Sequence, residues 1–300
     1  MNTLDIQAGQ KNFVSASEEA KLQFLDRFVK QTIAVYQAGQ LSSQALFELH
    51  HEFGHDFQLN TIQGHGLRKP FGYAGDFIMI DKIYTRYSSK IPRYRIWDEY
   101  FHRQAAPQAV RNRKGYFKKL VRKTLNEKKL VSLLNVGSGP GRDLAELYDS
   151  LSQPQRLHST SVDMDKRAIA YAQELNKLYT RYTRFENRNI LRFQCEQNFN
   201  MIWSAGLFDY FNDKVFVSVL RRFSNNLKPG GEIVIGNFNE DCNPSRAYME
   251  VFGEWFLHHR SEQQLIDLAQ KAGYRTNEIS VGREPENVNL FLHIKPVHSK

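Results

Sequence analysis

Three glycines follow a short apolar stretch, and their spacing is typical of a loop that holds a small ligand. Gly137, Gly139 and Gly141 come directly after Leu133–Val136. Glycine permits a tight turn and lets a ligand lie against the backbone. The spacing is G-x-G-x-G, and Arg142 stands where the dinucleotide form G-x-G-x-x-G needs a small residue. No Gly-Lys-Ser/Thr follows, so a P-loop is excluded. The loop therefore favours a nucleoside over a pyrophosphate.

Two further polar positions follow the loop in the order that a nucleoside pocket needs. Asp163 stands 22 residues after Gly141, at the end of the next expected strand, where a carboxylate can accept both hydroxyls of a ribose. Asn189 and Ile190 follow the third expected strand, where an amide can read an adenine edge. Loop, acid and amide together predict a nucleoside pocket. The alternative is a tight turn with a capping aspartate.

The elements that must position these residues alternate between strand and helix from residue 130 onward. Strands are expected at 130–136, 157–162, shortly before Asn189, at 201–204, at 232–237, near Ile279 and at 288–294. Helices are expected at 142–151, 166–178, 214–227 and 262–272. This alternation predicts an α/β fold with a Rossmann-like, doubly wound and mostly parallel seven-stranded sheet. The last strand suits an antiparallel addition.

The N-terminal part does not show this alternation of strands and helices. We expect residues 1–129 to form a mainly helical, basic cap or substrate region. Apolar residues at helical spacing predict helices at 21–36 and 44–59, and a basic helix at 111–125. Between them we expect a glycine-rich loop over Gly64–Gly75 and a short helix through Ile78–Tyr84. The cap is expected to cover the carboxyl edge of the sheet, with Gly72–Asp76 near the ligand. A plain connector is the alternative for that loop.

The net charge of +9 lies entirely in this N-terminal part. Residues 1–129 hold 21 Lys/Arg and 12 Asp/Glu, whereas residues 130–300 hold 20 of each. The stretch Arg86–Lys129 is densest, with 14 basic and three acidic residues. Such an asymmetry suggests an anionic partner, which could be a nucleic acid, a membrane surface or an acidic small molecule. A solvated, lysine-rich helix face would give the same pattern.

Composition places the chain among ordinary globular proteins. No apolar run reaches the roughly 18 residues of a membrane span. Residues 1–13 contain no apolar leader core, and two cysteines, Cys195 and Cys242, are too few for a disulfide framework or a thiolate zinc site. We therefore expect a cytoplasmic protein.

The motifs together resemble class I S-adenosylmethionine-dependent methyltransferases, through Asn135–Asp143, Val162–Asp165 and Asn226–Gly231. A departure is Asn135, where many of these enzymes have Asp or Glu. A narrower resemblance links the chain to bacterial enzymes assigned to methyl-esterifying 3-hydroxypalmitic acid, an extracellular signalling factor. The segments that carry it are Phe71–Asp76, Ala109–Arg113, Gly206–Phe211, Gly236–Phe238, Arg246–Glu250 and Trp255–Arg260.

The resemblance implies S-adenosyl-L-methionine as the cofactor, residues 130–300 as its binding domain, and no binding of NAD. The residues that it assigns to the cofactor are Tyr73, Arg113, Gly137, Ser138, Gly139, Gly141, Asp163, Met164, Asn189, Ile190, Ser204, Gly206 and Leu207. Arg113 is the candidate for holding a carboxylate, either that of the cofactor or that of the acceptor.

Methyl transfer from a sulfonium is an in-line displacement, so the enzyme must align the groups and exclude water. A carboxylate acceptor is already ionised at neutral pH, whereas a hydroxyl needs a general base. Asp76, Asp209, His258 and His259 are candidate bases, and Asp76, Asp209 and Tyr210 form the expected catalytic set. The expected substrate-binding residues are Arg111, Arg246, Tyr248, Trp255 and Arg260. Surface arginines and core aromatics are the alternatives for these positions.

We expect a small-molecule acid, lipid-like or otherwise apolar, to be the acceptor. An RNA methyltransferase is less favoured, because Ser204–Leu207 stands where enzymes acting on base amines have N/D-P-P-Y/F. A hydroxyl or amine methyltransferase and a non-catalytic binding module remain alternatives.

His51, Glu52 and His55 satisfy H-E-x-x-H, a zinc motif when it lies on one helix. Gly54 weakens such a helix, and the residues that follow do not extend the motif into a longer zinc-protease signature. We therefore expect no metal site.

Overall fold

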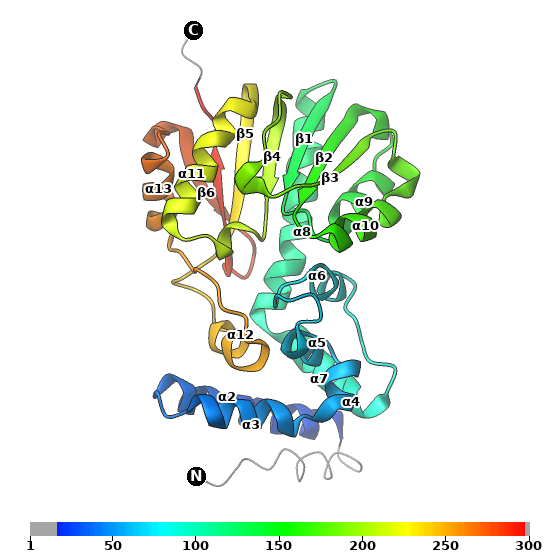
Figure 1. The fold of residues 1–300 in the computed structure, drawn as a ribbon, viewed down its shortest axis with the longest axis vertical. Coiled ribbons are helices and arrows are strands. Elements are labelled where there is room, and N and C mark those ends of the chain that lie inside the picture. The colour runs from blue at the N-terminus through cyan, green and yellow to red at the C-terminus, as the bar shows by residue number, and fades with distance from the viewer. Residues whose placement is uncertain (1–16, 298–300) are drawn as a thin grey trace. The chain divides into compact units, whose positions relative to one another are not determined.

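The computed structural model describes residues 17–297 (Figure 1). Residues 1–13, in which we expect no leader, lie outside the described residues. The chain divides into two compact units: Met1–Gln108 with Pro244–Phe256, and Ala109–Asn243 with Leu257–Lys300. Within the described range, every helix is too short or too polar to cross a membrane.

The second unit contains the predicted seven-stranded sheet (Figure 1). Its strands are β1 Val131–Val136, β2 Leu157–Asp163, β3 Thr183–Asn187, β4 Phe199–Ser204, β5 Leu227–Phe238, β6 Ile279–Arg283 and β7 Asn289–Ile294. Their order is β3-β2-β1-β4-β5-β7-β6, with β7 antiparallel to both neighbours and the other pairs parallel. The Rossmann-like prediction is therefore confirmed, including the antiparallel last strand.

Helices cover both faces of this sheet. They are α8 Ala105–Glu127, α9 Arg142–Asp149, α10 Lys166–Leu175, α11 Asp213–Phe223 and α13 Glu262–Lys271. The side chains of α8 and α9 pack on Leu133 and Trp203, whereas those of α11 and α13 pack on Leu134 and Ile202. Successive residues of a strand point to opposite faces, so the apolar β1 supplies both cores.

The parallel strands bring their carboxyl ends to one edge. Val136 of β1 pairs with Val162 of β2, and Ser204 of β4 pairs with Ile235 of β5. Short 3-10 helices join the elements at Pro154–Arg156, Lys177–Tyr179, Ile190–Arg192, Phe208–Tyr210, Ser224–Asn226 and Thr276–Glu278. The glycine loop, Asp163 and the residues after β3 and β4 therefore meet at the same edge.

The first unit is helical. It contains α2 Glu18–Gln37, α3 Ser43–Glu52, α4 Gly54–Asn60, α5 Ile62–Arg68, α6 Phe77–Tyr84, α7 Pro92–Arg103 and α12 Arg246–Gly253. The helix α12 lies far along the sequence but joins this unit through polar contacts. The Tyr36 hydroxyl donates to Glu250 Oε2 at 2.9 Å, and His50 Nε2 lies 2.6 Å from the carbonyl oxygen of Val251.

Part of the expected glycine-rich loop over Gly64–Gly75 instead belongs to the helix α5 Ile62–Arg68, so that expectation was wrong for Gly64–Arg68. The Thr61 side chain caps this helix by accepting from the Gly64 N–H at 2.9 Å. Gly64 also permits close packing, because a Cβ there would lie 2.3 Å from the Cα of Gln58 on α4. Gly64 therefore permits close contact between α4 and α5. The sequence alone does not distinguish a glycine at a helix contact from a glycine in a turn.

Candidate active site

The glycine loop that follows β1 has the backbone conformation that its residue types require. Gly137 and Gly139 have φ of +62° and +54°, in the left-handed region that disfavours other residues. The N–H groups of Gly137 and Ser138 both donate to the carbonyl oxygen of Val162, at 2.8 and 3.2 Å. A Cβ added at Gly139 would meet nothing within 4 Å. The loop is thus fastened at its start and open at Gly139, where a ligand can approach the backbone.

Asp163 links the end of β2 to this loop. Its Oδ2 accepts from the Gly139 N–H at 2.9 Å, and its Oδ1 accepts from the Asp165 N–H at 2.9 Å. Burial raises the pKa of this carboxyl, while the two backbone donors oppose that rise. Because a carboxylate has about four acceptor sites, both oxygens can still accept from a ligand.

Hydrogen bonds also join the residues at the end of β3 to the segment Asp163–Met164. The Asn187 side chain donates to the carbonyl oxygen of Met164 at 2.9 Å, and the Arg188 N–H donates to that of Asp163 at 3.0 Å. Asn189 is exposed, and its Oδ1 accepts from the Leu191 N–H at 2.9 Å. Apolar side chains stay exposed here: Met164 is 69% and Leu191 44% accessible. Ile190 is buried. The edge therefore presents exposed apolar side chains beside an amide.

Arg113 of α8 is buried against the segment that follows β4. Its Nη1 donates to the carbonyl oxygen of Ala205 at 3.1 Å, and a Cβ at Gly206 would lie 3.1–3.4 Å from the guanidinium. Leu207, next along this segment, lies 2.9 Å from a Cβ built on Gly137, so the segment also packs on the glycine loop. A glycine at position 206 leaves room for the flat guanidinium.

The positive charge of Arg113 acts on two buried carboxyls, those of Asp143 and Asp209. Burial raises the pKa of Asp143, in the first turn of α9, and of Asp209 to about 6 each, and the Arg113 charge opposes the rise in both. Asp209 is 1% exposed and accepts from the Phe238 N–H at 2.7 Å. Tyr210, by contrast, is 40% exposed. The acid is therefore part of the scaffold beneath the edge, while its neighbour is accessible.

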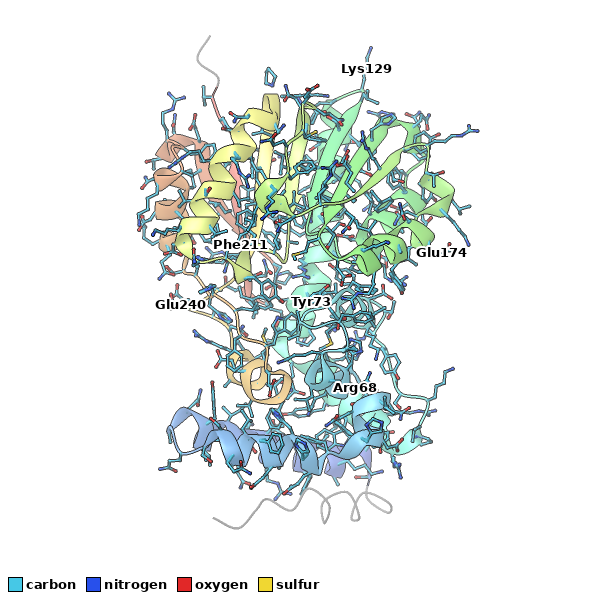
Figure 2. All side chains as sticks on the ribbon, viewed as in Figure 1. Arg68, Tyr73, Lys129, Glu174, Phe211 and Glu240 are labelled. Atoms are coloured by element: carbon cyan, nitrogen blue, oxygen red, sulfur yellow. The ribbon has the colours of Figure 1, made fainter. Side chains whose placement is uncertain are left out.

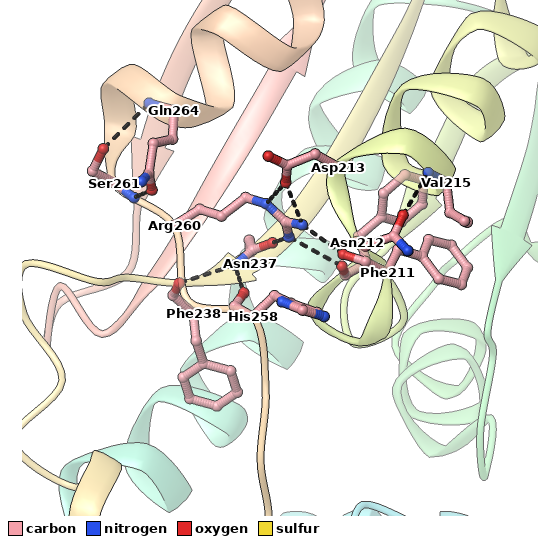
Figure 3. Close-up of polar contacts among 11 residues, drawn as sticks. Phe211, Asn212, Asp213, Val215, Asn237, Phe238, His258, Arg260, Ser261 and Gln264 are labelled. Carbon is pink, nitrogen blue, oxygen red and sulfur yellow. Dashed lines mark hydrogen bonds and ion pairs between the residues drawn. The ribbon is translucent and has the colours of Figure 1, made fainter.

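Arg260 is engaged entirely within the protein (Figure 3). Its Nε and Nη2 donate to Asp213 Oδ1 at 3.2 and 3.0 Å. Its Nη1 donates to Asn237 Oδ1 at 2.8 Å and to the carbonyl oxygen of Phe208 at 3.3 Å, and its Nη2 also donates to that of Phe211 at 2.5 Å. A guanidinium has five N–H donors, so this set leaves none over for another anion.

In the helical unit, Asp76 is fully buried and caps α6. Its Oδ1 accepts from the Met79 N–H at 2.8 Å, and both its oxygens lie within 3.0 Å of His65 Nε2. Tyr73, labelled in Figure 2, lies half-buried on the segment between α5 and α6. Asp76 therefore fixes where α6 begins and holds an imidazole of α5.

The other expected substrate residues of this unit lie on or beside α12. Arg246 is bonded to Glu250, four residues on, at 3.0 Å. Tyr248 is buried, and its hydroxyl donates to Gln63 Oε1 at 2.8 Å. Trp255 is 8% exposed. Arg111, in the sheet unit, is half-buried.

The H-E-x-x-H residues do not share a continuous helix. The helix α3 ends at Glu52 and α4 begins at Gly54, whose φ is +74°, so the helix is interrupted within the motif. His51 Nδ1 lies 2.8 Å from the carbonyl oxygen of Phe47. Across residues 17–297, no group of three or more His, Cys, Asp or Glu is arranged to hold a metal ion.

Sequence reasoning missed three polar residues that the structure places beside the expected ones. His65 pairs with Asp76, Gln63 pairs with Tyr248, and the charge of Arg113 acts on Asp143. Asp143 could have been found, because it directly follows the glycine loop. His65 and Gln63 carry no local signal, since their partners are 11 and 185 residues away.

The sheet order, the glycine loop and the carboxylate at the end of β2 define a Rossmann-like protein, a class that holds its ligands at the carboxyl edge of the sheet. A family model described as a methyltransferase domain matches residues 127–276, which is half of the chain. The chain belongs to this methyltransferase domain family. It is an S-adenosylmethionine-dependent methyltransferase, and its cofactor is S-adenosyl-L-methionine.

Solved structures agree on the fold. A possible exported protein from Bordetella parapertussis matches with a TM-score of 0.63 at 18% identity, over 94% of this chain and 98% of that one. A putative O-methyltransferase from Nostoc punctiforme matches with a TM-score of 0.52 at 12% identity, over 80% and 71% of the two chains. No curated protein matches this chain significantly.

The residues at the edge fit this cofactor. The open backbone at Gly139 and the carboxylate of Asp163 suit a ribose that lies against the loop. The hydroxyl oxygens of Ser138 and Ser204 are buried and have no hydrogen-bond partner among the described residues. Ser138 follows β1 and Ser204 ends β4 at this edge, so their unsatisfied hydroxyls are suited to a polar ligand.

Proposed function

We propose that this enzyme transfers the methyl group of S-adenosylmethionine to the carboxylate of an apolar, lipid-like small-molecule acid. The observation that carries the proposal is the state of the two candidate acids. Asp76 and Asp209 are 0% and 1% exposed, and each accepts a backbone hydrogen bond. Burial therefore withdraws both carboxyls from a hydroxyl acceptor in solvent; of the two histidine candidates, His259 is buried and His258 is exposed. A carboxylate acceptor needs no base, because it is already ionised at neutral pH.

In this proposal the cofactor supplies a methyl group already activated by the sulfonium charge, and the protein supplies alignment. Asp163 accepts the ribose hydroxyls, and Met164, Asn189 and Ile190 border the base. Gly137, Ser138, Gly139 and Gly141 form the loop, and Ser204, Gly206 and Leu207 border the methionine part.

Arg113 is the proposed carboxylate partner at the reacting end. The guanidinium is buried and its Nη1 donates to the carbonyl oxygen of Ala205, which holds it in place. A planar guanidinium can meet a carboxylate with two parallel bonds. Asp209 then acts as a positioning residue through Arg113. Tyr210 is the member of the expected catalytic set that is accessible for contact with the reacting groups.

The helical unit is the proposed acceptor-binding part, with Tyr73, Tyr248 and Trp255 as its aromatic residues. Asp76 positions α6 in this scheme and does not act as a base. We leave Arg260 out of the proposed substrate contacts, because all five of its N–H donors are used within the protein. Arg246 is exposed and stays a candidate, although its Nε donates to Glu250. Arg111 stays a candidate for the acceptor.

The basic surplus contributes less to steering than its size suggests. Lys114 and Lys118 both pair with Glu146, at 2.7 and 2.8 Å. Lys129 lies just before β1, at the edge of the sheet opposite the glycine loop (Figure 2). We therefore place the electrostatic attraction of an acid at the Arg113 end of α8, and nothing here favours the RNA alternative. A cytoplasmic location is also part of the proposal and is consistent with the unpaired Cys195 and Cys242.

The direct test offers purified enzyme a labelled methyl donor with three matched acceptors of equal chain length: a fatty acid, the fatty alcohol and the fatty amine. The proposal expects label in the acid alone. Transfer to the alcohol or the amine, with none to the acid, would reject the carboxyl assignment while leaving the methyltransferase assignment intact.

A further inference from the structure

The end of α8 and the turn after it carry four lysines that no acid of the protein neutralises: Lys119, Lys123, Lys128 and Lys129. None of the four makes an ion pair within residues 17–297, whereas Lys114 and Lys118, earlier on the helix, share Glu146. Residues 119–130 contain five basic residues and one acid, Glu127. This part of the sheet unit therefore has an uncompensated positive charge.

The four charges lie close together at the surface. Lys119 and Lys123 are exposed and stand one helical turn apart, and α8 ends about 12 Å beyond Lys119. Lys128 is half-buried and Lys129 is exposed. Figure 2 shows the Lys129 side chain pointing away from the sheet. This spacing is close to the Debye length of about 10 Å at 0.1 M salt, so the charges act together on an anionic surface.

Arg156 holds the turn that carries two of these lysines. Its Nε donates to the carbonyl oxygen of Lys129 at 3.0 Å. Its Nη2 donates to the carbonyl oxygens of Leu125 and Lys128, at 2.5 and 2.9 Å. The last carbonyls of a helix have no partner within the helix, and here one guanidinium supplies it. The backbone of the turn is therefore fixed, and the lysine side chains project from a rigid base.

An exposed apolar side chain stands directly beside these charges. Leu130 is 56% exposed, although the next residue, Val131 of β1, is fully buried. The sequence Lys128-Lys129-Leu130 thus places a leucine next to two ammonium groups. A basic cluster with an exposed apolar side chain is suited to the headgroup layer of an anionic membrane. We refer to five residues as the amino-edge patch: Lys119, Lys123, Lys128, Lys129 and Leu130.

The composition of the patch favours a lipid surface over a nucleic acid. Proteins that bind nucleic acids use planar guanidinium groups for phosphates and aromatic rings for bases. The two arginines of this region are engaged within the protein, because Arg122 donates to Ser150 Oγ at 2.6 Å and Arg156 donates to carbonyl oxygens. Residues 119–130 contain no aromatic residue. What the patch offers is point charges and one aliphatic side chain.

We propose that the amino-edge patch docks on the surface of an anionic phospholipid bilayer. The lysines pair with the headgroup phosphates, and Leu130 inserts among the headgroups. The patch lies at the amino end of β1, whereas the glycine loop follows its carboxyl end, so docking leaves the loop uncovered. Docking holds the enzyme where apolar molecules collect. The inference does not depend on which atom of the acceptor receives the methyl group.

Sedimentation with vesicles measures the docking. The full-length enzyme is mixed with vesicles of phosphatidylglycerol and phosphatidylcholine in equal parts, or of phosphatidylcholine alone, at about 0.1 M salt. The variants are the double change Lys128→Gln with Lys129→Gln, and the single change Leu130→Ser. Leu178→Ser is the matched control, because Leu178 is 80% exposed and also follows an exposed lysine, but it lies just before β3.

We expect the wild-type protein and Leu178→Ser to bind the anionic vesicles and to leave the neutral ones unbound. Each lysine near an anionic surface strengthens binding about fivefold, so the double lysine variant should bind about 25-fold more weakly. Leu130→Ser should bind about fivefold more weakly, because a partly inserted leucine is lost. Equal binding to the two kinds of vesicle, or a loss in Leu178→Ser as large as that in Leu130→Ser, would overturn the proposal.

A fluorescence measurement tests the insertion itself. Leu130→Trp should be quenched by a nitroxide on the lipid chain of anionic vesicles, whereas Leu178→Trp should not. The native tryptophans are at most 8% exposed and give both variants the same background. Equal quenching in the two variants would overturn the insertion of Leu130. Single-stranded RNA that binds more tightly than the vesicles, and less tightly to the double lysine variant, would assign the patch to a nucleic acid and overturn the proposal.

Discussion

The Asp163 carboxylate accepts a hydrogen bond from the backbone N–H of Gly139, 24 residues earlier, at 2.9 Å. The acid at the end of β2 therefore holds the glycine loop in place, and we propose that it also accepts the ribose hydroxyls. One side chain sets both the shape of the loop and the polarity of the pocket.

Asp163→Ala should weaken binding of S-adenosylhomocysteine by about 1–3 kcal/mol, because it removes hydrogen bonds from a charged acceptor. Asp163→Asn should lose less, since one amide oxygen still accepts from a backbone N–H. Calorimetry measures both, with Asp241→Ala, an exposed aspartate, as the control. Unchanged affinity in Asp163→Ala would move the ribose role to another residue.

Arg113→Met should lower methyl transfer sharply while the fold survives, because it keeps the aliphatic stem and removes the fork. Arg113→Lys should recover only part of the activity, since a point charge cannot make two parallel bonds. Arg122→Met, on the exposed side of the same helix, is the matched control. Full activity in Arg113→Lys would indicate that charge alone is needed.

Gly206→Ala should impair the enzyme through Arg113, since the added Cβ would sit 3.1–3.4 Å from the guanidinium. The effect should shrink in the Arg113→Met background, because the group that is displaced is gone. A double-mutant cycle measures this coupling in kcat/KM. Additive effects would show that Gly206 is required for a reason unrelated to Arg113.

Asp209→Asn should change how stability depends on pH. The folded pKa of about 6 lies above the ordinary value of 3.8, so the wild-type carboxyl binds its proton more tightly when folded. Its contribution to stability is therefore present below about pH 4 and lost as the pH rises to about 6. The melting temperature of Asp209→Asn relative to wild type should rise across that window. A constant difference from pH 4 to 6.5 would contradict the raised pKa.

The sequence was sufficient to predict the sheet and the order of the loop, acid and amide, because these depend on local patterns. Gly137 and Asp163 lie in successive strand–turn–helix units, in which the spacing along the sequence determines where a residue lies on the sheet. The roles of residues whose partners are distant in the sequence could not be predicted in this way. Arg260 resembled an exposed anion-binding arginine until its contacts with Asn237 and Asp213 were known. The helix α5 resembled a loop, because glycine at a helix contact and glycine in a turn look alike.

If the enzyme makes a methyl ester, the alkali lability of its product shows this most directly. Enzyme, labelled S-adenosylmethionine and the preferred acid are incubated, and the extracted product is treated with mild alkali. A carboxyl methyltransferase product should release the label as methanol, with recovery of the free acid. A label that stays on the product through this treatment would show an ether or amine linkage, and it would contradict transfer to a carboxylate.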